Sequence, residues 1–360
     1  MSISLEILIK LVKSLYGIFL KIWNNSLYFS ILLFVISFAI RTPAFIWPSI
    51  PISDETYYVP ASLSILESGE DPNYVHPPFG KYLFALTISF FGDNPLGWRF
   101  FSVFLGSLAV PMVYILGREI YGNMIGVIAS FFLLIDPMAY KMSELAMLDI
   151  PLMFLILLGF MMLYWKKYEL SAIAFGLSCA IKFVGAFAII GAIVYLIISK
   201  KFNQIAKLII IPTMIVFLLY IPIILNKGLS EWISEMFFVF NWHATLEAEH
   251  PAASGPFGWL FGITPFPVAN GENPVLVSSN PFLYPLAIPF SIYMLYEYRK
   301  KEFDKSYIMP ILWWLSTYVP FMLLPRKTQY IFYLLPSIPA LLIIISYGLF
   351  IIIKRLILTD

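Results

Sequence analysis

Acidic and basic side chains gather in one short stretch of an otherwise apolar chain. Between residues 54 and 81 the sequence brings together the pair Asp54-Glu55, further acids, His76 and Lys81. Acids beside a bilayer are costly to place and usually mark chemistry or ion handling. This stretch is therefore the first candidate for a reaction centre.

Local signals place the two leading acids beside a short helix. Pro60 favours a helix start and Gly69 a helix stop, which predicts a helix over residues 60–68 with Asp54 and Glu55 in the preceding turn. The alternative is that these acids only cap the helix. Because they are adjacent, the two side chains are not expected to face one ligand from a regular helix.

Further charged residues interrupt apolar runs later in the chain. Lys182 has apolar neighbours on both sides, so it needs an anionic partner, for which phosphate is a natural choice. Asp149 opens an apolar run and has a helix cap as its alternative role. Arg99 and Arg326 have the alternative role of interfacial anchors.

The chain has three histidines, His76, His243 and His250. Their spacing fits no closed zinc motif, so we expect no metal site.

Composition decides the class of protein that must position these residues. Of 360 residues, 60% are hydrophobic and 12% are charged, against about 25% charged in soluble domains. This predicts an all-α polytopic membrane protein. The net charge of +2 gives no reason to expect a nucleic-acid partner, and the one cysteine, Cys179, excludes an intramolecular disulfide.

Hydropathy and charge together predict ten transmembrane helices in a single domain over residues 1–360. Residues 1–25 read as a helix on the membrane surface. Residues 79–92 are too few for a span, which takes about 20, and are predicted to lie in the interface. With both termini in the cytoplasm, the basic clusters then fall inside. The predicted spans are 27–47, 98–117, 124–140, 150–165, a tight pair across 170–198, 207–225, 281–298, 307–324 and 330–353.

This topology gathers the unusual polar residues on the outer surface. It leaves a first outer loop over residues 48–97 and a long outer loop over residues 226–280, in which 229–249 has helical spacing and should lie on the membrane surface. The outward positions are Asp54, Glu55, Arg99, Asp149, Lys182, Arg326 and all three histidines. One shared face is the strongest physical sign of a site.

At these residues the sequence resembles the protein O-mannosyltransferases. Asp54-Glu55 followed by His76-Pro77-Pro78-Phe79-Gly80-Lys81 resembles their first outer loop, which carries an Asp-Glu pair and His-Pro-Pro-Leu-Gly-Lys. The stretches around Asp149, Lys182, His243–Trp259 and Arg326–Pro336 are similar too. The chain departs from the pattern at Phe79. These 360 residues also hold no counterpart of the large lumenal domain of the eukaryotic enzymes, which predicts a prokaryotic cell membrane.

The resemblance implies a GT-C glycosyltransferase of the bilayer, with an active site facing outside. It would move a sugar, mannose by preference, from a polyprenyl (dolichyl) phosphate to a hydroxyl, with protein Ser/Thr preferred and inversion at C1. A lipid-phosphate donor implies no cofactor or metal.

The implied roles divide the candidate residues into three groups. Asp54 is the expected base, and Glu55 is expected to share that role or to position the acceptor. The residues expected to bind the donor phosphate and sugar are Lys182, Arg326, Arg99, Asp149 and His243. The residues expected to bind the acceptor or to position the loop are His76, Lys81 and His250.

Two other activities and several states stay open. The related aminoarabinose transferases have Lys-Pro-Pro in place of His76-Pro77-Pro78, and a transferase of that kind would glycosylate a lipid or glycan acceptor. A lipid-linked sugar transporter would place its charges along a midplane path, often in inverted repeats, and no internal repeat is apparent. The protein could act alone or as a homo- or hetero-dimer.

Overall fold

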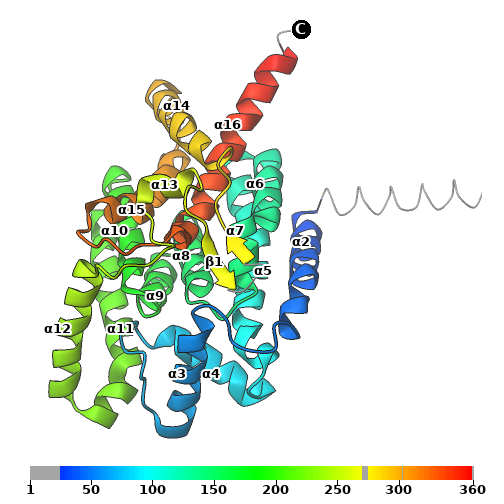
Figure 1. Ribbon diagram of the computed structural model, residues 1–360. Helices are drawn as coiled ribbons and strands as arrows, with labels where there is room; N and C mark the ends of the chain where they lie inside the picture. Colours follow the sequence, from blue (N-terminus) through cyan, green and yellow to red (C-terminus); the bar gives the residue numbers. More distant parts are fainter. Residues whose placement is uncertain (1–24, 270–274, 302, 359–360) are drawn as a thin grey trace, which may run out of the picture.

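The protein is a bundle of helices with one small hairpin of strands (Figure 1). The computed structural model describes residues 25–269, 275–301 and 303–358. The surface helix predicted over residues 1–25 lies outside the described residues, apart from the cap residue Asn25. The first half of the chain forms α2 (Ser26–Arg41), η1 (Thr42–Phe45), α3 (Glu55–Ser68), α4 (Phe79–Phe91), α5 (Pro95–Tyr121), α6 (Asn123–Ile135), α7 (Pro137–Ser143), α8 (Asp149–Tyr164) and α9 (Tyr168–Cys179).

The second half adds the outer helices, the hairpin and the C-terminal helices. Strands β1 and β2 pair antiparallel, with Phe266 opposite Val277. The elements are η2 (Phe183–Gly185), α10 (Ala186–Ile198), η3 (Phe202–Gln204), α11 (Ile205–Lys227), α12 (Leu229–Thr245), α13 (Pro256–Leu260), β1 (Phe266–Ala269), β2 (Val275–Val277), η4 (Tyr284–Leu286), α14 (Ala287–Lys301), η5 (Lys305–Ile308), α15 (Met309–Leu323), η6 (Ile331–Ser337) and α16 (Ile338–Leu358).

The bundle is that of a multi-pass membrane protein. Among the described residues, four helical stretches are long and apolar enough to cross a bilayer: Ser26–Phe45, Pro95–Tyr121, Phe202–Lys227 and Ile331–Ile357. The bent pair α6–α7 makes a fifth if it counts as one span. Each of the ten predicted spans contains a helix, but several of these helices are shorter, so the number ten stays a prediction.

The bend between α6 and α7 has a local cause. The two helices meet at 58° around Asp136, which is followed by Pro137. The Asp136 carboxylate accepts hydrogen bonds from the amides of Met138 and Ala139, so it caps α7 while α6 ends. The span predicted over residues 124–140 is therefore two short helices.

Helix α3 begins earlier than predicted. It starts at Glu55 and carries Pro60 inside, so the prediction of a start at Pro60 was wrong. The Glu55 carboxylate bonds back to the Ile52 amide at 3.0 Å, which fixes the first turn ahead of the proline. The predicted stop is confirmed, because Gly69 ends the helix in the left-handed conformation with φ 76°.

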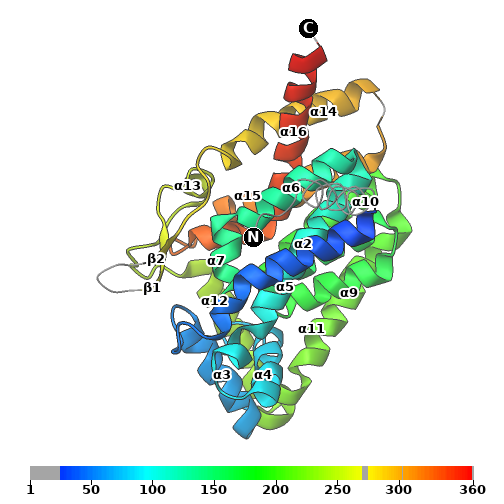
Figure 2. The same cartoon turned by 90° about the vertical axis from the view of Figure 1, so that its right-hand side faces the viewer.

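The predicted break after residue 92 is confirmed by a tight turn between α4 and α5. Gly92 has φ 86°, and a Cβ on Gly97 would collide with the Gly92 carbonyl. Helix α4 buries Phe84, Ala85 and Ile88 against its neighbours. It is thus a short helix with one buried face, and it runs antiparallel to the start of α5 (Figure 2).

The predicted helix over 229–249 is present as α12. It turns at Gly228 and packs back along α11, where Met236 and Val239 meet Tyr220 and Ile223 (Figure 1). Its last turn brings His243 beside α8, η2 and the segment after α15.

Candidate functional site

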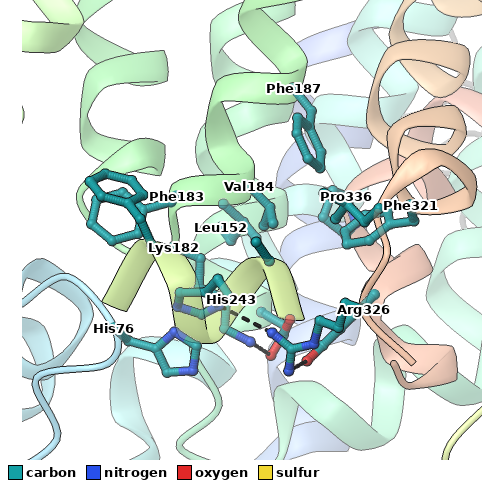
Figure 3. Close-up of a pocket in the computed structure, with 15 residues that line it drawn as sticks. His76, Leu152, Lys182, Phe183, Val184, Phe187, His243, Phe321, Arg326 and Pro336 are labelled. Carbon is teal, nitrogen blue, oxygen red and sulfur yellow. Dashed lines mark hydrogen bonds and ion pairs between the residues drawn. The ribbon is translucent and has the colours of Figure 1, made fainter. Parts of the chain in front are cut away.

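An apolar cavity with a polar mouth lies where these elements converge. It holds about 220 Å³. Its inner wall is built from Leu152, Val184, Phe187, Phe321 and Pro336, and the charged and histidine side chains gather at one end (Figure 3). The polar residues at that end are His76, Asp149, Lys182, His243 and Arg326. A lipid carrying a charged head group has this division of polarity.

Arg326 supplies a cation that pairs with no carboxylate in the described part of the chain. Its Nε donates to the Thr328 carbonyl at 2.6 Å, and its two terminal nitrogens reach His243 Nδ1 at 3.1 Å and the Tyr333 hydroxyl at 3.2 Å. No ion pair to Arg326 exists among the described residues. A guanidinium held by neutral partners is free to bind an anion.

His243 is neutral and has a defined tautomer. Its Nε2 lies 2.6 Å from the Val75 carbonyl, which only accepts, so Nε2 carries the proton and Nδ1 accepts from Arg326. Burial, together with the charges of Arg326 and Lys182, lowers the pKa of His243 to about 4, against the Val75 bond, which raises it. His243 thus orients the arginine rather than adding charge.

Lys182 and Asp149 form a buried ion pair across the cavity mouth. The ammonium lies 2.7 Å from the Asp149 carboxylate and faces the rings of Phe332 and Tyr333, each at 5.6 Å. Asp149 does not cap its helix, because Leu148 occupies the cap position. The anionic partner that the sequence requires for Lys182 is therefore supplied within the chain by Asp149.

Asp54 lies next to this pair and does not cap α3. The carboxyl makes no capping bond and instead accepts a hydrogen bond from the Tyr58 hydroxyl. Burial raises the pKa of Asp54 to about 6, opposed by the charge of Lys182 and the Tyr58 bond and reinforced by Asp149. A carboxylate with its pKa near the working pH suits a general base.

Glu55 and Arg99 do not join the site, which corrects their predicted placement. They form a fully buried bidentate pair, with nitrogen–oxygen distances of 2.7 and 2.8 Å. Amides of Ile52 and Ala146 also bond to the Glu55 carboxylate, and Arg99 donates to the Ala44 carbonyl. All four lone-pair directions of Glu55 are occupied, so the pair pins the first outer loop to α5.

Glu55→Gln should therefore destabilise the protein rather than act on turnover alone. The amide leaves the Arg99 charge buried without its counter-ion, a change that typically costs about 3–5 kcal/mol. We expect a clear drop in the thermal unfolding midpoint in detergent. Glu67→Gln, at an exposed position of the same helix, should leave the midpoint unchanged. Equal midpoints for both variants would contradict this role.

Lys81 positions the loop that carries His76. It is fully buried, forms an ion pair with Asp71, and donates to the carbonyls of Asn73 at 2.5 Å and His76 at 2.8 Å. The His76 ring reaches the cavity mouth 5.3 Å from the His243 ring. His76 therefore belongs to the lining of the cavity.

His250 lies apart from the cavity lining. Its ring meets Tyr330 at 5.1 Å and Phe266 at 6.3 Å. Within the described part of the chain, no three His, Cys, Asp or Glu side chains are grouped to hold a metal ion.

Two tyrosines of the site were missed from the sequence. Tyr58 follows Asp54 by four residues, the spacing at which helical side chains meet, so it could have been found. Tyr333 joins Arg326 to Lys182 and is one of 22 tyrosines in the chain. It stands out only once the backbone folds.

Comparison with known sequences gives matches to one family over part of the chain. A family profile described as dolichyl-phosphate-mannose-protein mannosyltransferase matches residues 75–225. A polyprenol-phosphate-mannose–protein mannosyltransferase of Mycobacterium tuberculosis is 35% identical over 117 residues, 31% of this chain and 22% of that protein. The protein of the same description from Corynebacterium glutamicum is 34% identical over 119 residues, 29% and 23% of the two chains. The chain thus matches less than a quarter of either relative.

Comparison with solved structures gives the fold. ArnT from Cupriavidus metallidurans bound to undecaprenyl phosphate superposes with a TM-score of 0.66 at 16% identity, covering 89% of this chain and 60% of that one. The oligosaccharyltransferase AglB from Archaeoglobus fulgidus gives 0.59 at 14%, covering 92% and 51%. The chain has the GT-C fold of membrane glycosyltransferases, as predicted.

Proposed function

We propose that this protein is an inverting glycosyltransferase that moves a sugar, most favourably mannose, from a polyprenyl (dolichyl) phosphate to a hydroxyl of a protein Ser or Thr. One observation carries the proposal. Asp54, a carboxyl whose pKa is raised to about 6, stands beside the mouth of a cavity at which Arg326 pairs with no carboxylate of the described residues. The partial matches to polyprenol-phosphate-mannose–protein mannosyltransferases support the choice of donor and acceptor.

The donor would lie with its phosphodiester at Arg326 and Lys182 and its first prenyl units along the apolar wall. The side chains of Phe187 and Phe321 on that wall present no polar atoms to the prenyl chain. Asp54 takes the proton of the acceptor hydroxyl while the oxygen of that hydroxyl forms a bond to C1 of the sugar. The C1–O bond to phosphate breaks with its electron pair on the phosphate oxygen, where Arg326 stabilises the charge.

The reaction centre would face the cell exterior, with both termini in the cytoplasm. The protein would act alone or as a homo- or hetero-dimer. Lys182 is held by Asp149, so its charge is balanced within the chain before the donor arrives. Arg326 pairs with no carboxylate of the described residues, so its guanidinium is available to the negative charge of a phosphodiester.

Transfer should not depend on a divalent metal. The phosphate charge in this proposal is met by Arg326 and Lys182, so chelation removes nothing that the leaving group needs. We expect the rate of purified protein to persist in excess EDTA, with added Mg²⁺ or Mn²⁺ giving no stimulation. Loss of activity in EDTA that metal restores would contradict this arrangement.

The decisive experiment supplies purified protein with radiolabelled polyprenyl-phosphate mannose and a mixed Ser/Thr peptide pool. Label on peptide hydroxyls supports the proposal. Label on a lipid or glycan instead, when these are supplied, identifies an acceptor of the aminoarabinose-transferase kind. Label that crosses a vesicle membrane on its lipid without transfer identifies a transporter and overturns the proposal.

A further inference from the structure

Arg326 is stabilised in a different way from three other buried cations of the protein. Lys81, Arg99 and Lys182 each pair with a carboxylate. Arg326 is buried as well, yet its hydrogen-bond partners among the described residues are a carbonyl, a histidine nitrogen and a hydroxyl. A buried cation is costly unless its surroundings compensate for the water that it loses. Part of that compensation must therefore come from something other than a counter-charge.

Two aromatic rings supply this further compensation. The guanidinium carbon of Arg326 lies 5.1 Å from the centre of the Trp242 ring and 5.8 Å from that of the Tyr333 ring. Both distances are within the roughly 6 Å at which a ring face attracts a cation, and tryptophan gives the strongest attraction of this kind. A ring stabilises the charge without cancelling it, whereas a carboxylate would neutralise the guanidinium and compete with an incoming phosphate.

Backbone hydrogen bonds hold Trp242 and Arg326 together. Trp242 lies near the end of α12. Just beyond this helix, the carbonyl of Leu246 accepts hydrogen bonds from the amides of Lys327 and Thr328, at 3.1 and 3.2 Å. The end of α12 and the segment after α15 are thus joined on both sides of the guanidinium, by the rings and by the main chain. The position of the arginine therefore depends on α12.

This arrangement leaves part of the Arg326 guanidinium available to a ligand. Arginine has five N–H donors. The Thr328 carbonyl, the His243 ring and the Tyr333 hydroxyl take three of them. One N–H on each terminal nitrogen has no partner in the described part of the chain, and two N–H groups suit the oxygens of a phosphate. Trp242 does not line the cavity, so any effect that it has on a ligand there passes through the arginine.

We propose that Trp242 is a positioning residue for the donor phosphate. Its ring face holds the Arg326 guanidinium at the cavity mouth, with the charge uncancelled and two N–H groups left for the phosphate oxygens. The inference rests on the proposed function. It adds to that function a residue that sets how strongly the protein distinguishes a charged lipid from an uncharged one.

The test measures the binding of two lipids to the detergent-purified full chain, a fluorescent polyprenyl phosphate and the matching uncharged polyprenol. Trp242→Leu removes the ring face, so the dissociation constant for polyprenyl phosphate should rise about two- to thirtyfold, the range expected for a contact between a cation and a ring. The dissociation constant for the polyprenol should not change. Trp242→Phe keeps a smaller ring and should recover part of the loss.

Phe237→Leu is the matched control. Phe237 is an exposed aromatic residue of the same helix, so its replacement should leave the binding of both lipids as in the wild type. If Trp242→Leu does not fold, the same comparison is made with Trp242→Phe, which should weaken the binding of polyprenyl phosphate to a smaller extent and leave that of the polyprenol unchanged.

A loss confined to the phosphate lipid supports the inference. Unchanged binding of polyprenyl phosphate in both Trp242 variants overturns it. A similar loss for both lipids also overturns it, because Trp242 would then only shape the cavity. If the wild type binds polyprenyl phosphate no more tightly than polyprenol, Arg326 meets no phosphate, and the proposed function fails together with this inference.

Discussion

Asp54→Asn should lower the transfer rate at least about a hundredfold while the donor still binds. Asparagine keeps the size and the hydrogen bond from Tyr58 but does not accept the acceptor proton, so only the transition state loses stabilisation. The measurement is initial rate against acceptor concentration, with donor affinity determined separately. Glu67→Gln, an exposed acid on the same helix, is the matched control and should keep full turnover.

The pH profile tests the same assignment independently. The active form of the base is the carboxylate, and burial places the pKa of Asp54 near 6. The wild-type rate should therefore fall as the pH drops through about 6, and Asp54→Asn should lose that limb. If Asp54→Asn keeps near-full turnover while Glu55→Gln folds normally and is inactive, the two roles are reversed. If both variants keep full turnover, neither acid is the base and the assignment of Asp54 fails.

Arg326→Gln should cost about a hundredfold or more in kcat/KM for the donor. The guanidinium has no carboxylate partner in the described structure, so its charge is available to the phosphate that leaves. Removing one such preorganised donor typically costs about 10²–10³ in rate. Both donor affinity and turnover should fall, because the phosphate is charged before and after transfer.

The neighbouring lysine provides a control of equal charge. Lys327 is 73% exposed and pairs with Glu247 at 3.0 Å, so Lys327→Gln should change little. Arg326→Lys should recover part of the loss, since it keeps the charge but not the fork of hydrogen bonds to Thr328, His243 and Tyr333. Equal losses for Arg326→Gln and Lys327→Gln would place the donor phosphate elsewhere.

Lys182 shows how the structure changes the design of an experiment. From the sequence alone, Lys182→Met is the obvious test of phosphate binding. The ion pair with Asp149 means that this substitution strands a buried carboxylate, so loss of function could reflect misfolding. Lys182→Met combined with Asp149→Asn removes both charges and separates the two effects.

The order of helices and the identity of most site residues follow from the sequence for a simple reason. In a bilayer, apolar runs must form helices, and a charged residue costs free energy. A charged residue that interrupts an apolar run can therefore be recognised from the sequence. Asp54, Lys182, Asp149, His243 and Arg326 were found in this way, and the structure brings them to one place. The stop at Gly69 was equally local, because only backbone geometry was involved.

Which charges pair with which was decided by tertiary structure alone. Glu55 and Asp54 are neighbours in the chain, yet Glu55 forms an ion pair with Arg99 from α5, whereas Asp54 interacts with the charge of Lys182. The choice depends on where two distant segments cross, and no local pattern encodes a distance between them. The same holds for Tyr333, which the sequence does not distinguish from the other tyrosines until the fold places it in the cavity lining. Sequence determined the chemical groups available, and the fold decided which of them remain free to react, because an ion pair or hydrogen bond that satisfies a group also withdraws it from the substrate.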